Sequence, residues 1–202
     1  MEFFEHDTWG QGNSAVGDFS TRIPLLIADP RQPAKGPCAD VVRSIDLVPT
    51  ILDLLDIQTT GHEGRSLLPL LNGSTPTMDL PAFNETGVWI AHIPGLSPDH
   101  LRYPELLDLL TVADPKDGTI VIKDEYDEAV IRAKDRMIRR GRWKLVYQPL
   151  ETGYLLQLFD IATDPDCNQD VAIDYPELVS QLWDELRDWL LSDQVFGPTL
   201  RI

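Results

Sequence analysis

Apolar residues at helical spacing mark a first helix in the opening third of the chain. Four of them recur three to four positions apart, as on one face of a helix that packs against a core: Leu47, Ile51, Leu54 and Leu55. Asp46 precedes this run, where its carboxylate can accept hydrogen bonds from the free amides of the first turn. Pro49 falls within that turn, where proline is tolerated. The pattern therefore predicts a helix with a buried face, with Asp53 and Asp56 turned toward water.

A second helix is predicted from Pro176 onward. Its apolar residues form one continuous stripe: Leu178, Val179, Leu182, Trp183, Leu186, Trp189 and Leu190. Two tryptophans on such a stripe can line a ligand site, but an amphipathic helix more often covers a sheet. We expect this helix to pack on the strands that precede it.

A short continuous apolar run lies before the first helix, at residues 22–28, and ends at Asp29-Pro30. Such a run predicts a strand that is buried on both faces. A strand, an irregular connection and a helix in this order are typical of α/β proteins. A parallel strand needs neighbours on both sides to satisfy its backbone, yet the pattern shows one such strand only.

The last part of the chain is rich in short runs with β-branched or aromatic members, at residues 119–123, 128–133, 136–140, 143–147 and 155–159. Asp135, Gly141 and Asp164-Pro165 provide turns between them. We expect an antiparallel sheet of about four strands, covered by the C-terminal helix.

Before this sheet, prolines divide residues 81–117 into short elements, with a predicted strand at 87–91 and a predicted helix at 104–110. The predicted organisation is therefore α/β, with residues 1–80 as an α/β part, 81–117 as a connector and 118–202 as a small α+β subdomain.

The charge balance excludes several classes of partner. The 202 residues contain 33 Asp plus Glu and 17 Lys plus Arg, for a formal net charge of −16. So acidic a surface repels phosphate backbones and anionic headgroups, so neither nucleic acid nor a membrane surface is expected as a partner. No apolar stretch approaches the roughly 20 residues of a membrane span. The first residues lack the features of a signal peptide, which predicts a cytoplasmic protein if the chain begins at Met1.

Against this acidic background stands a basic segment of seven residues: Arg132, Lys134, Arg136, Arg139, Arg140, Arg142 and Lys144. Such a segment can bind an anionic substrate or partner. More often these side chains pair with the protein's own carboxylates, and we expect that arrangement here.

Several blocks resemble the sulfatase family of the alkaline phosphatase superfamily, in order and in spacing. Near the start these are residues 22–27 (RIPLLI), 46–52 (DLVPTIL, a D-x-x-P-T helix) and 64–71 (GRSLLPLL, a G-x-S-L-x-P-L-L segment). Toward the end, residues 139–147 (RRGRWKLVY), 158–165 (LFDIATDP) and 176–179 (PELV) resemble the family's C-terminal subdomain. The resemblance covers nearly all of the chain. It implies the C-terminal piece of a sulfatase-like α/β sandwich, followed by a small sheet-and-helix subdomain.

For the parent enzyme, the resemblance implies a sulfuric ester hydrolase with a formylglycine or serine nucleophile in a C/S-x-P-x-R motif. No residue of the chain fits that motif: Cys38 and Cys167 fail it, and so does every serine. The family also holds a divalent metal, commonly calcium, which neutralises the oxygens of the transferring group. Its ligands are an early pair of aspartates and a later Asp-His or Asp-Asn pair, and neither pair is present in the sequence. We therefore assign no catalytic residue and no metal ligand, and predict that the chain alone is inactive.

Two residues match positions at which family members contact the anionic oxygens of the substrate. His6 stands where a histidine is frequent, and Gln11 stands about five residues later, where the family has a lysine or a second histidine. Glutamine can donate a hydrogen bond but brings no positive charge, so it would stabilise the transferring group less than lysine. His6 and Gln11 are the candidate substrate-binding residues. The other interpretation of His6 is an exposed histidine on an acidic loop.

Three hypotheses for function follow. In the first, the chain is the C-terminal part of a sulfatase-like hydrolase, whose substrate is a sulfate ester and whose N-terminal half is its partner. In the second, the parent is a phosphoesterase, phosphonate hydrolase or phosphoethanolamine transferase of the same superfamily. In the third, the chain is a non-catalytic binding or interaction domain derived from a sulfatase. The third would leave the apolar run at residues 22–28 as an exposed edge, which favours aggregation.

Overall fold

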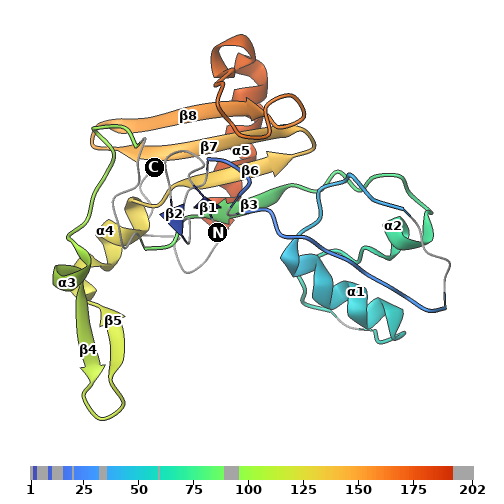
Figure 1. The fold of residues 1–202 in the computed structure, drawn as a ribbon, viewed down its shortest axis with the longest axis horizontal. Coiled ribbons are helices and arrows are strands. Elements are labelled where there is room, and N and C mark those ends of the chain that lie inside the picture. Colours follow the sequence, from blue (N-terminus) through green and yellow to red (C-terminus); the bar gives the residue numbers. More distant parts are fainter. Residues whose placement is uncertain are drawn as a thin grey trace. The chain divides into compact units, whose positions relative to one another are not determined.

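The computed structural model describes residues 2–3, 9–10, 16–19, 21–31, 36–58, 60–88 and 96–192. The chain divides into two compact units. Unit 1 combines residues 1–22, 83–138 and 143–202, and unit 2 combines residues 23–82 and 139–142. Figure 1 shows the elements along the chain.

The central element of unit 1 is a four-stranded sheet. Its strands are β3 (Ala82–Glu85), β6 (Arg136–Arg140), β7 (Trp143–Leu150) and β8 (Gly153–Asp160), in the order β3-β6-β7-β8. β7 and β8 pair antiparallel along their full length. Glycines with positive φ turn the chain from β6 to β7 (Gly141, 53°) and from β7 to β8 (Gly153, 95°), a conformation that other residues rarely adopt. The predicted antiparallel sheet of about four strands is confirmed.

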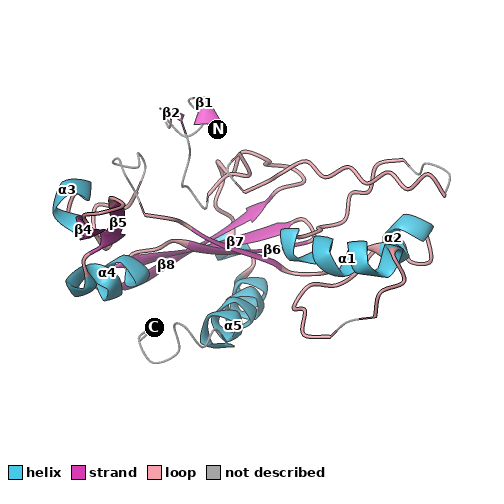
Figure 2. Ribbon diagram, turned by 90° about the horizontal axis from the view of Figure 1, so that it is seen from below, coloured by secondary structure: helices cyan, strands magenta, loops and turns pink. Residues whose placement is uncertain are grey.

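Helix α5 (Pro176–Ser192) packs on one face of this sheet (Figure 2). The cluster between them contains Ile138, Leu145, Tyr147, Leu158, Leu182, Trp183, Leu186 and Leu190. Trp183 stacks on Tyr147, with ring centroids 5.3 Å apart and planes 8° apart. Trp189 stacks on Phe83 in the same manner, at 4.8 Å and 4°. Trp183 is therefore part of the core and Trp189 packs against it, so the predicted role of the helix is confirmed.

The opposite face and the outer edge of the sheet are covered by loops. Met137, Val146, Phe159 and Cys167 form a second buried cluster, against which Val16 packs. At the edge, the carboxylate of Asp170 accepts a hydrogen bond from the backbone N–H of Leu158 (3.0 Å), and Val171 N–H donates to Leu158 O (2.9 Å). The backbone of Leu158 thereby finds both of its partners outside the sheet, which protects this point of the β8 edge.

The remaining elements of unit 1 are short. β1 (Glu2–Phe3) pairs antiparallel with β2 (Trp9–Gly10), and β4 (Leu110–Asp114) pairs antiparallel with β5 (Thr119–Ile122). α3 spans Leu106–Leu109, α4 spans Asp127–Arg132, and 3-10 turns span Asp124–Tyr126 and Ala172–Asp174. The predicted strand at 119–123 therefore forms, but within a separate hairpin and not in the four-stranded sheet.

Three predictions for this region need correction. The strand expected at 128–133 is helix α4, because Asp127 and Glu128 in its first turn and Arg132 in its last turn complement the helix dipole. The helix expected at 104–110 is shorter, because Leu110 already begins β4. The strand expected at 87–91 is not formed at residues 87 and 88, while β3 occupies 82–85. Residues 89–91 lie outside the described part of the chain.

Unit 2 contains a 3-10 turn (Ser44–Asp46), α1 (Leu47–Leu54) and α2 (Leu68–Asn72). Thr50 joins the two helical blocks: its hydroxyl donates to Asp46 O (2.5 Å) and accepts from the N–H of Leu67 (2.9 Å). Gly64 permits their close approach, since a Cβ at this position would lie 2.0 Å from Ile45 O. The blocks at 46–52 and 64–71 therefore fold against each other.

The apolar run at residues 22–28 is not a strand and is not buried. Among the described residues it has no strand partner, and the side chains of Ile23 and Leu26 are 67% and 93% exposed. The prediction failed because a parallel strand exists only between neighbours that accept and donate its backbone hydrogen bonds. The buried face predicted for helix α1 is confirmed only in part. Leu47 and Leu54 are partly buried as expected, but Ile51 and Leu55 are exposed.

No helix in the described ranges combines the length and the apolar character that crossing a membrane requires.

Candidate functional site

The two candidate substrate-binding residues, His6 and Gln11, lie outside the described residues. On either side of His6 the chain forms the β1–β2 pair, in which Glu2 lies opposite Gly10 and Phe3 opposite Trp9. The assignment of both residues to substrate binding stays a prediction.

The next described segment, Val16–Asp18, is fixed to the sheet by Lys144 of β7. The ammonium of Lys144 donates to Val16 O and Gly17 O, each at 2.8 Å, and lies 3.2 Å from a carboxylate oxygen of Asp18. The Lys144 side chain is fully buried. A Cβ at Gly17 would lie 1.9 Å from the ring of Phe19, so a larger residue there would displace that side chain.

Asp46, the first residue of the D-x-x-P-T block, is a fully buried acceptor in unit 2. Arg43 donates to both of its oxygens, from Nη2 at 2.7 Å and from Nε at 3.0 Å. Two backbone N–H groups also donate to it, those of Arg43 (2.9 Å) and Arg65 (2.8 Å). Its carboxylate makes no hydrogen bond to the first turn of α1, so the expectation that it caps this helix is wrong. Asp46 instead holds the G-x-S-L segment against the helix.

The surroundings of Asp46 decide its charge state. Burial alone would raise its pKa, but the hydrogen bonds from Arg43 and from Arg65 N–H and the positive charge of Arg43 outweigh it. The pKa of Asp46 therefore lies below its ordinary value, and the carboxylate is ionised at neutral pH.

A buried polar network in unit 1 was not predicted from the sequence. His100 Nε2 lies 2.6 Å from Asp135 Oδ1, and His100 Nδ1 lies 2.6 Å from Leu101 O. Gln148 reaches the other oxygen of Asp135 at 3.4 Å, and Asp135 N–H donates to the hydroxyl of Thr86 (2.9 Å). All four side chains of the network are buried. Each faces other protein groups, so the network joins the residue after β3, the residue before β6, strand β7 and the segment around His100, but it offers no surface to a substrate.

Four members of the basic segment pair with carboxylates of the chain, as expected. Glu85 pairs with Lys134 Nζ at 2.5 Å and lies 3.6 Å from Arg136 Nε. Arg140 pairs with Asp79 at 3.0 Å, and Lys144 with Asp18 as described above. Burial lowers the pKa of Arg136, although the charge of Glu85 opposes this shift. These four cations are engaged within the protein, which disfavours the interpretation of the segment as an anion-binding surface.

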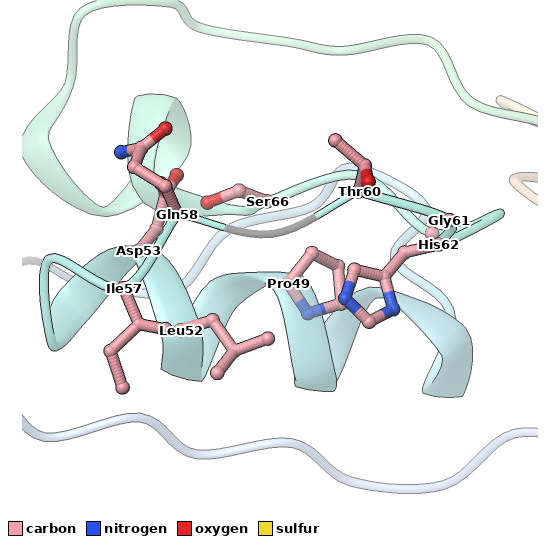
Figure 3. A pocket seen from close by; sticks show the side chains of 10 residues that line it. Pro49, Leu52, Asp53, Ile57, Gln58, Thr60, Gly61, His62 and Ser66 are labelled. Carbon is pink, nitrogen blue, oxygen red and sulfur yellow. The ribbon is translucent and has the colours of Figure 1, made fainter.

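A shallow hollow of about 200 Å³ lies beside α1 in unit 2 (Figure 3). Its lining consists of Pro49, Leu52, Asp53, Ile57, Gln58, Thr60, Gly61, His62, Gly64 and Ser66. The set contains no lysine or arginine, and Asp53 and His62 are exposed. A sulfate ester would find no fixed positive charge here, so we do not assign this hollow to substrate.

The divalent metal implied by the resemblance has no site in the described part of the chain. Within those ranges, no three His, Cys, Asp or Glu side chains converge as metal ligands. The described residues therefore do not fit such an ion, and no chemical step is assigned to it here.

The curated proteins that are similar in sequence to this chain include several sulfatases. No protein-family model matches the chain. Arylsulfatase K of Homo sapiens is 29% identical over 164 residues, which are 81% of this chain and 24% of that protein. Arylsulfatase K of Xenopus laevis is 28% identical over 169 residues, 83% of this chain and 26% of that protein. An extracellular sulfatase SULF-1 homolog of Drosophila melanogaster is 40% identical over 62 residues, 30% of this chain and 6% of that protein.

Solved structures with similarity to the chain include a 2-O GAG sulfatase (TM-score 0.47, 19% identity, 77% of this chain and 26% of that one). They also include the phosphonate monoester hydrolase of Agrobacterium radiobacter (TM-score 0.41, 23% identity, 71% of this chain and 23% of that one). The curated relatives confirm the resemblance to the C-terminal portion of sulfatases over about four fifths of the chain. The chain spans about a quarter of the length of these arylsulfatase relatives.

Proposed function

We propose that this chain, which is related to the C-terminal portion of sulfatases, works as the C-terminal part of a sulfuric ester hydrolase. In this proposal the parent protein cleaves a sulfate ester by displacement assisted by a divalent metal. Sequence outside these 202 residues supplies the nucleophile and the metal ligands, so the chain alone is inactive. The relationship to arylsulfatase K over 164 residues supports the reaction class.

The observation that carries the proposal is an apolar surface on unit 2. Helix α1 and the turn before it expose an aliphatic row at helical spacing: Ile45, Val48, Ile51 and Leu55, each 46–61% exposed. Ile23, Leu25 and Leu26 are exposed in the same unit. An exposed aliphatic row of this kind is typical of an interaction site. We propose that the remaining part of the hydrolase, about three quarters of the length of the relatives, covers this aliphatic row.

A charge placed in the aliphatic row is expected to prevent this association. Val48→Asp should weaken binding between the chain and the upstream part of the parent protein by at least about tenfold, because the carboxylate would be buried without a partner. Binding is measured by co-expression and titration of the two purified parts.

Val112→Asp is the matched control, since Val112 and Val48 are both 52% exposed and Val112 lies in β4 of unit 1. The control should change binding by less than about twofold. Equal losses in both variants, or no loss in Val48→Asp, would contradict docking at α1. Circular dichroism shows whether each variant is folded.

We further propose that His6 and Gln11 contact the anionic oxygens of the substrate. In the parent protein, His6→Ala is expected to lower kcat/KM for an aryl sulfate by about 10²-fold, the cost of losing one donor to a developing charge. His62→Ala removes an exposed histidine of unit 2 and should leave kcat/KM unchanged. An equal effect of the two substitutions would refute the assignment of His6.

The same assay distinguishes a sulfuric ester hydrolase from a phosphoesterase or a phosphonate hydrolase. A sulfuric ester hydrolase turns over an aryl sulfate faster than an aryl phosphate or an aryl phosphonate. The reverse order would favour a phosphoesterase or a phosphonate hydrolase. A chain that is translated without upstream sequence and is a stable monomer would favour a non-catalytic binding domain.

A further inference from the structure

The β4–β5 hairpin of unit 1 is a separate sheet (Figure 1), and within the described ranges it consists of these two strands alone. Every residue at positions 111–121 is exposed. A hairpin of two strands is marginally stable at best in water, and a third strand or a packed face is needed for independent stability. An added strand would therefore stabilise this hairpin.

One face of the hairpin is aliphatic. Leu110 lies opposite Ile122, and Val112 lies opposite Ile120. Because side chains alternate between the two faces of a strand, these four residues share one face. Val112 and Ile120 are 52% and 63% exposed. Exposed aliphatic surface of this kind is typical of an interaction site.

The outer edge of β5 is suited to pairing with a further strand. Its residues, Thr119–Ile122, are all β-branched and uncharged, and such residues favour strands. Charged residues, prolines and bulges are the usual devices that block an edge. β4 carries such a device, because its register with β5 shifts between Val112 and Asp114. β5 contains neither a charge nor a proline, so its outer edge can accept a strand.

The segment that contains the hairpin is strongly acidic. Residues 105–128 include eight Asp and Glu and two Lys, so they carry six of the sixteen net negative charges of the chain. The charge of Glu125, together with partial burial and the charge of Asp108, raises the pKa of Tyr126. Lys123 lies over the Tyr126 ring, 5.9 Å from its centroid. All eight acidic side chains are exposed: Glu105, Asp108, Asp114, Asp117, Asp124, Glu125, Asp127 and Glu128.

This charge decides between the possible occupants of the edge. Pairing of β5 with β5 of a second copy would bring two acidic segments together, and their like charges oppose that association. A strand in which aliphatic residues alternate with lysine or arginine matches both features of the hairpin. Its backbone can pair with β5, its aliphatic side chains can extend the face of Val112 and Ile120, and its cations can meet the carboxylates.

We propose that the outer edge of β5 binds an extended segment of another protein, in which aliphatic residues alternate with lysine or arginine, as a third strand of the hairpin. This association depends neither on the proposed hydrolase reaction nor on the docking of the upstream part at α1.

Titration of the purified chain with a synthetic peptide that alternates lysine and isoleucine tests this site. We expect saturable binding, with amides of β5 exchanging more slowly by about tenfold or more at saturation, because the peptide accepts their hydrogen bonds, while amides of α5 keep their rates. A peptide with glutamate in place of lysine should bind at least about tenfold more weakly. Equal binding of the two peptides, or unchanged exchange in β5, would overturn the proposal.

The substitution Ile120→Asp separates docking from a general attraction of cations to an acidic protein. It makes the hairpin more acidic, so a general attraction would become stronger, whereas docking should weaken by about tenfold because a carboxylate enters the aliphatic face. Ile120→Thr keeps a β-branched residue and should weaken binding by about threefold, so it tests the site if Ile120→Asp does not fold. Undiminished binding in both variants would contradict docking at β5.

Val48→Asp is the matched control, because it adds the same charge at a position of unit 2 that is 52% exposed. It should change peptide binding by less than about twofold. An equal loss in Val48→Asp and Ile120→Asp would mean that the peptide does not bind at the hairpin.

The other possible occupants give distinct results. Exchange in β5 that slows as the concentration of the chain alone rises would identify a second copy. Exchange in β5 that is slowed by the upstream part of the parent protein would mean that the parent itself covers this edge. Either result would overturn a separate basic partner and would leave the proposed hydrolase reaction unaffected.

Discussion

Replacing Asp46 by alanine is expected to lower the free energy of unfolding of unit 2 by about 3–5 kcal/mol, the usual cost of removing one partner from a buried ion pair. The Arg43 guanidinium would lose its counter-charge. Water could not fully replace it, because the Arg43 side chain is only 14% exposed. The N–H groups of Arg43 and Arg65 would lose their acceptor. Urea unfolding, followed by hydrogen exchange of amides in α1, measures this change.

The pH dependence of this loss gives a second readout from the same variant. Because the pKa of Asp46 is lowered in the folded state, its stabilising contribution is complete above the unfolded-state pKa of about 4 and disappears as the pH falls through the lowered folded-state pKa. The difference between the original chain and Asp46→Ala should therefore be largest at pH 7 and shrink below about pH 4. Asp53→Ala, which removes an exposed carboxylate of α1, should change stability by less than about 0.5 kcal/mol. A difference that is constant from pH 7 to the acid range would contradict the ion-pair explanation.

In unit 1, Leu186→Ala is expected to cost about 3–5 kcal/mol of unfolding free energy, as other fully buried leucines do. Leu186 is 0% exposed and lies in the cluster between α5 and the sheet. The loss combines the transfer of the side chain out of water with the cavity left behind. Urea unfolding monitored by tryptophan fluorescence follows it, because Trp183 belongs to the same cluster.

Leu191→Ala is the matched control, with the same substitution in the same helix. Leu191 is 52% exposed, so the expected change is about 0.5 kcal/mol or less. Similar losses at positions 186 and 191 would mean that α5 does not bury the face assigned to it.

Local patterns predicted the elements whose partners lie nearby in sequence. The stripe of α5 and the Gly141 turn between β6 and β7 can be read from spacing and residue type alone. Helix α4 was missed because residues 128–133 carry both β-branched residues and good helix formers. Its charged ends, Asp127 and Arg132, were the available signal.

Features that depend on distant partners could not be predicted in the same way. The apolar run at 22–28 has the composition of a buried strand, but pairing requires neighbours that no local pattern provides. Asp46 was expected to bond the helix that follows it, whereas three of its donors come from Arg43 and a fourth from Arg65, 19 residues away. His100 and Asp135 are 35 residues apart. For Lys144 the signal was present: a lysine in a strand, next to Trp143, Leu145 and Val146, needs either solvent or a specific partner.

The most direct test of the proposal is the turnover of an aryl sulfate by the purified chain, with added calcium or manganese, alone and together with the upstream part of the parent protein. The first step is to read the DNA upstream of the Met1 codon for an open frame that encodes a C/S-x-P-x-R motif. We expect no turnover above background from the chain alone, and turnover when both parts are present. Turnover by the chain alone, or none with both parts folded and associated, would contradict the proposal.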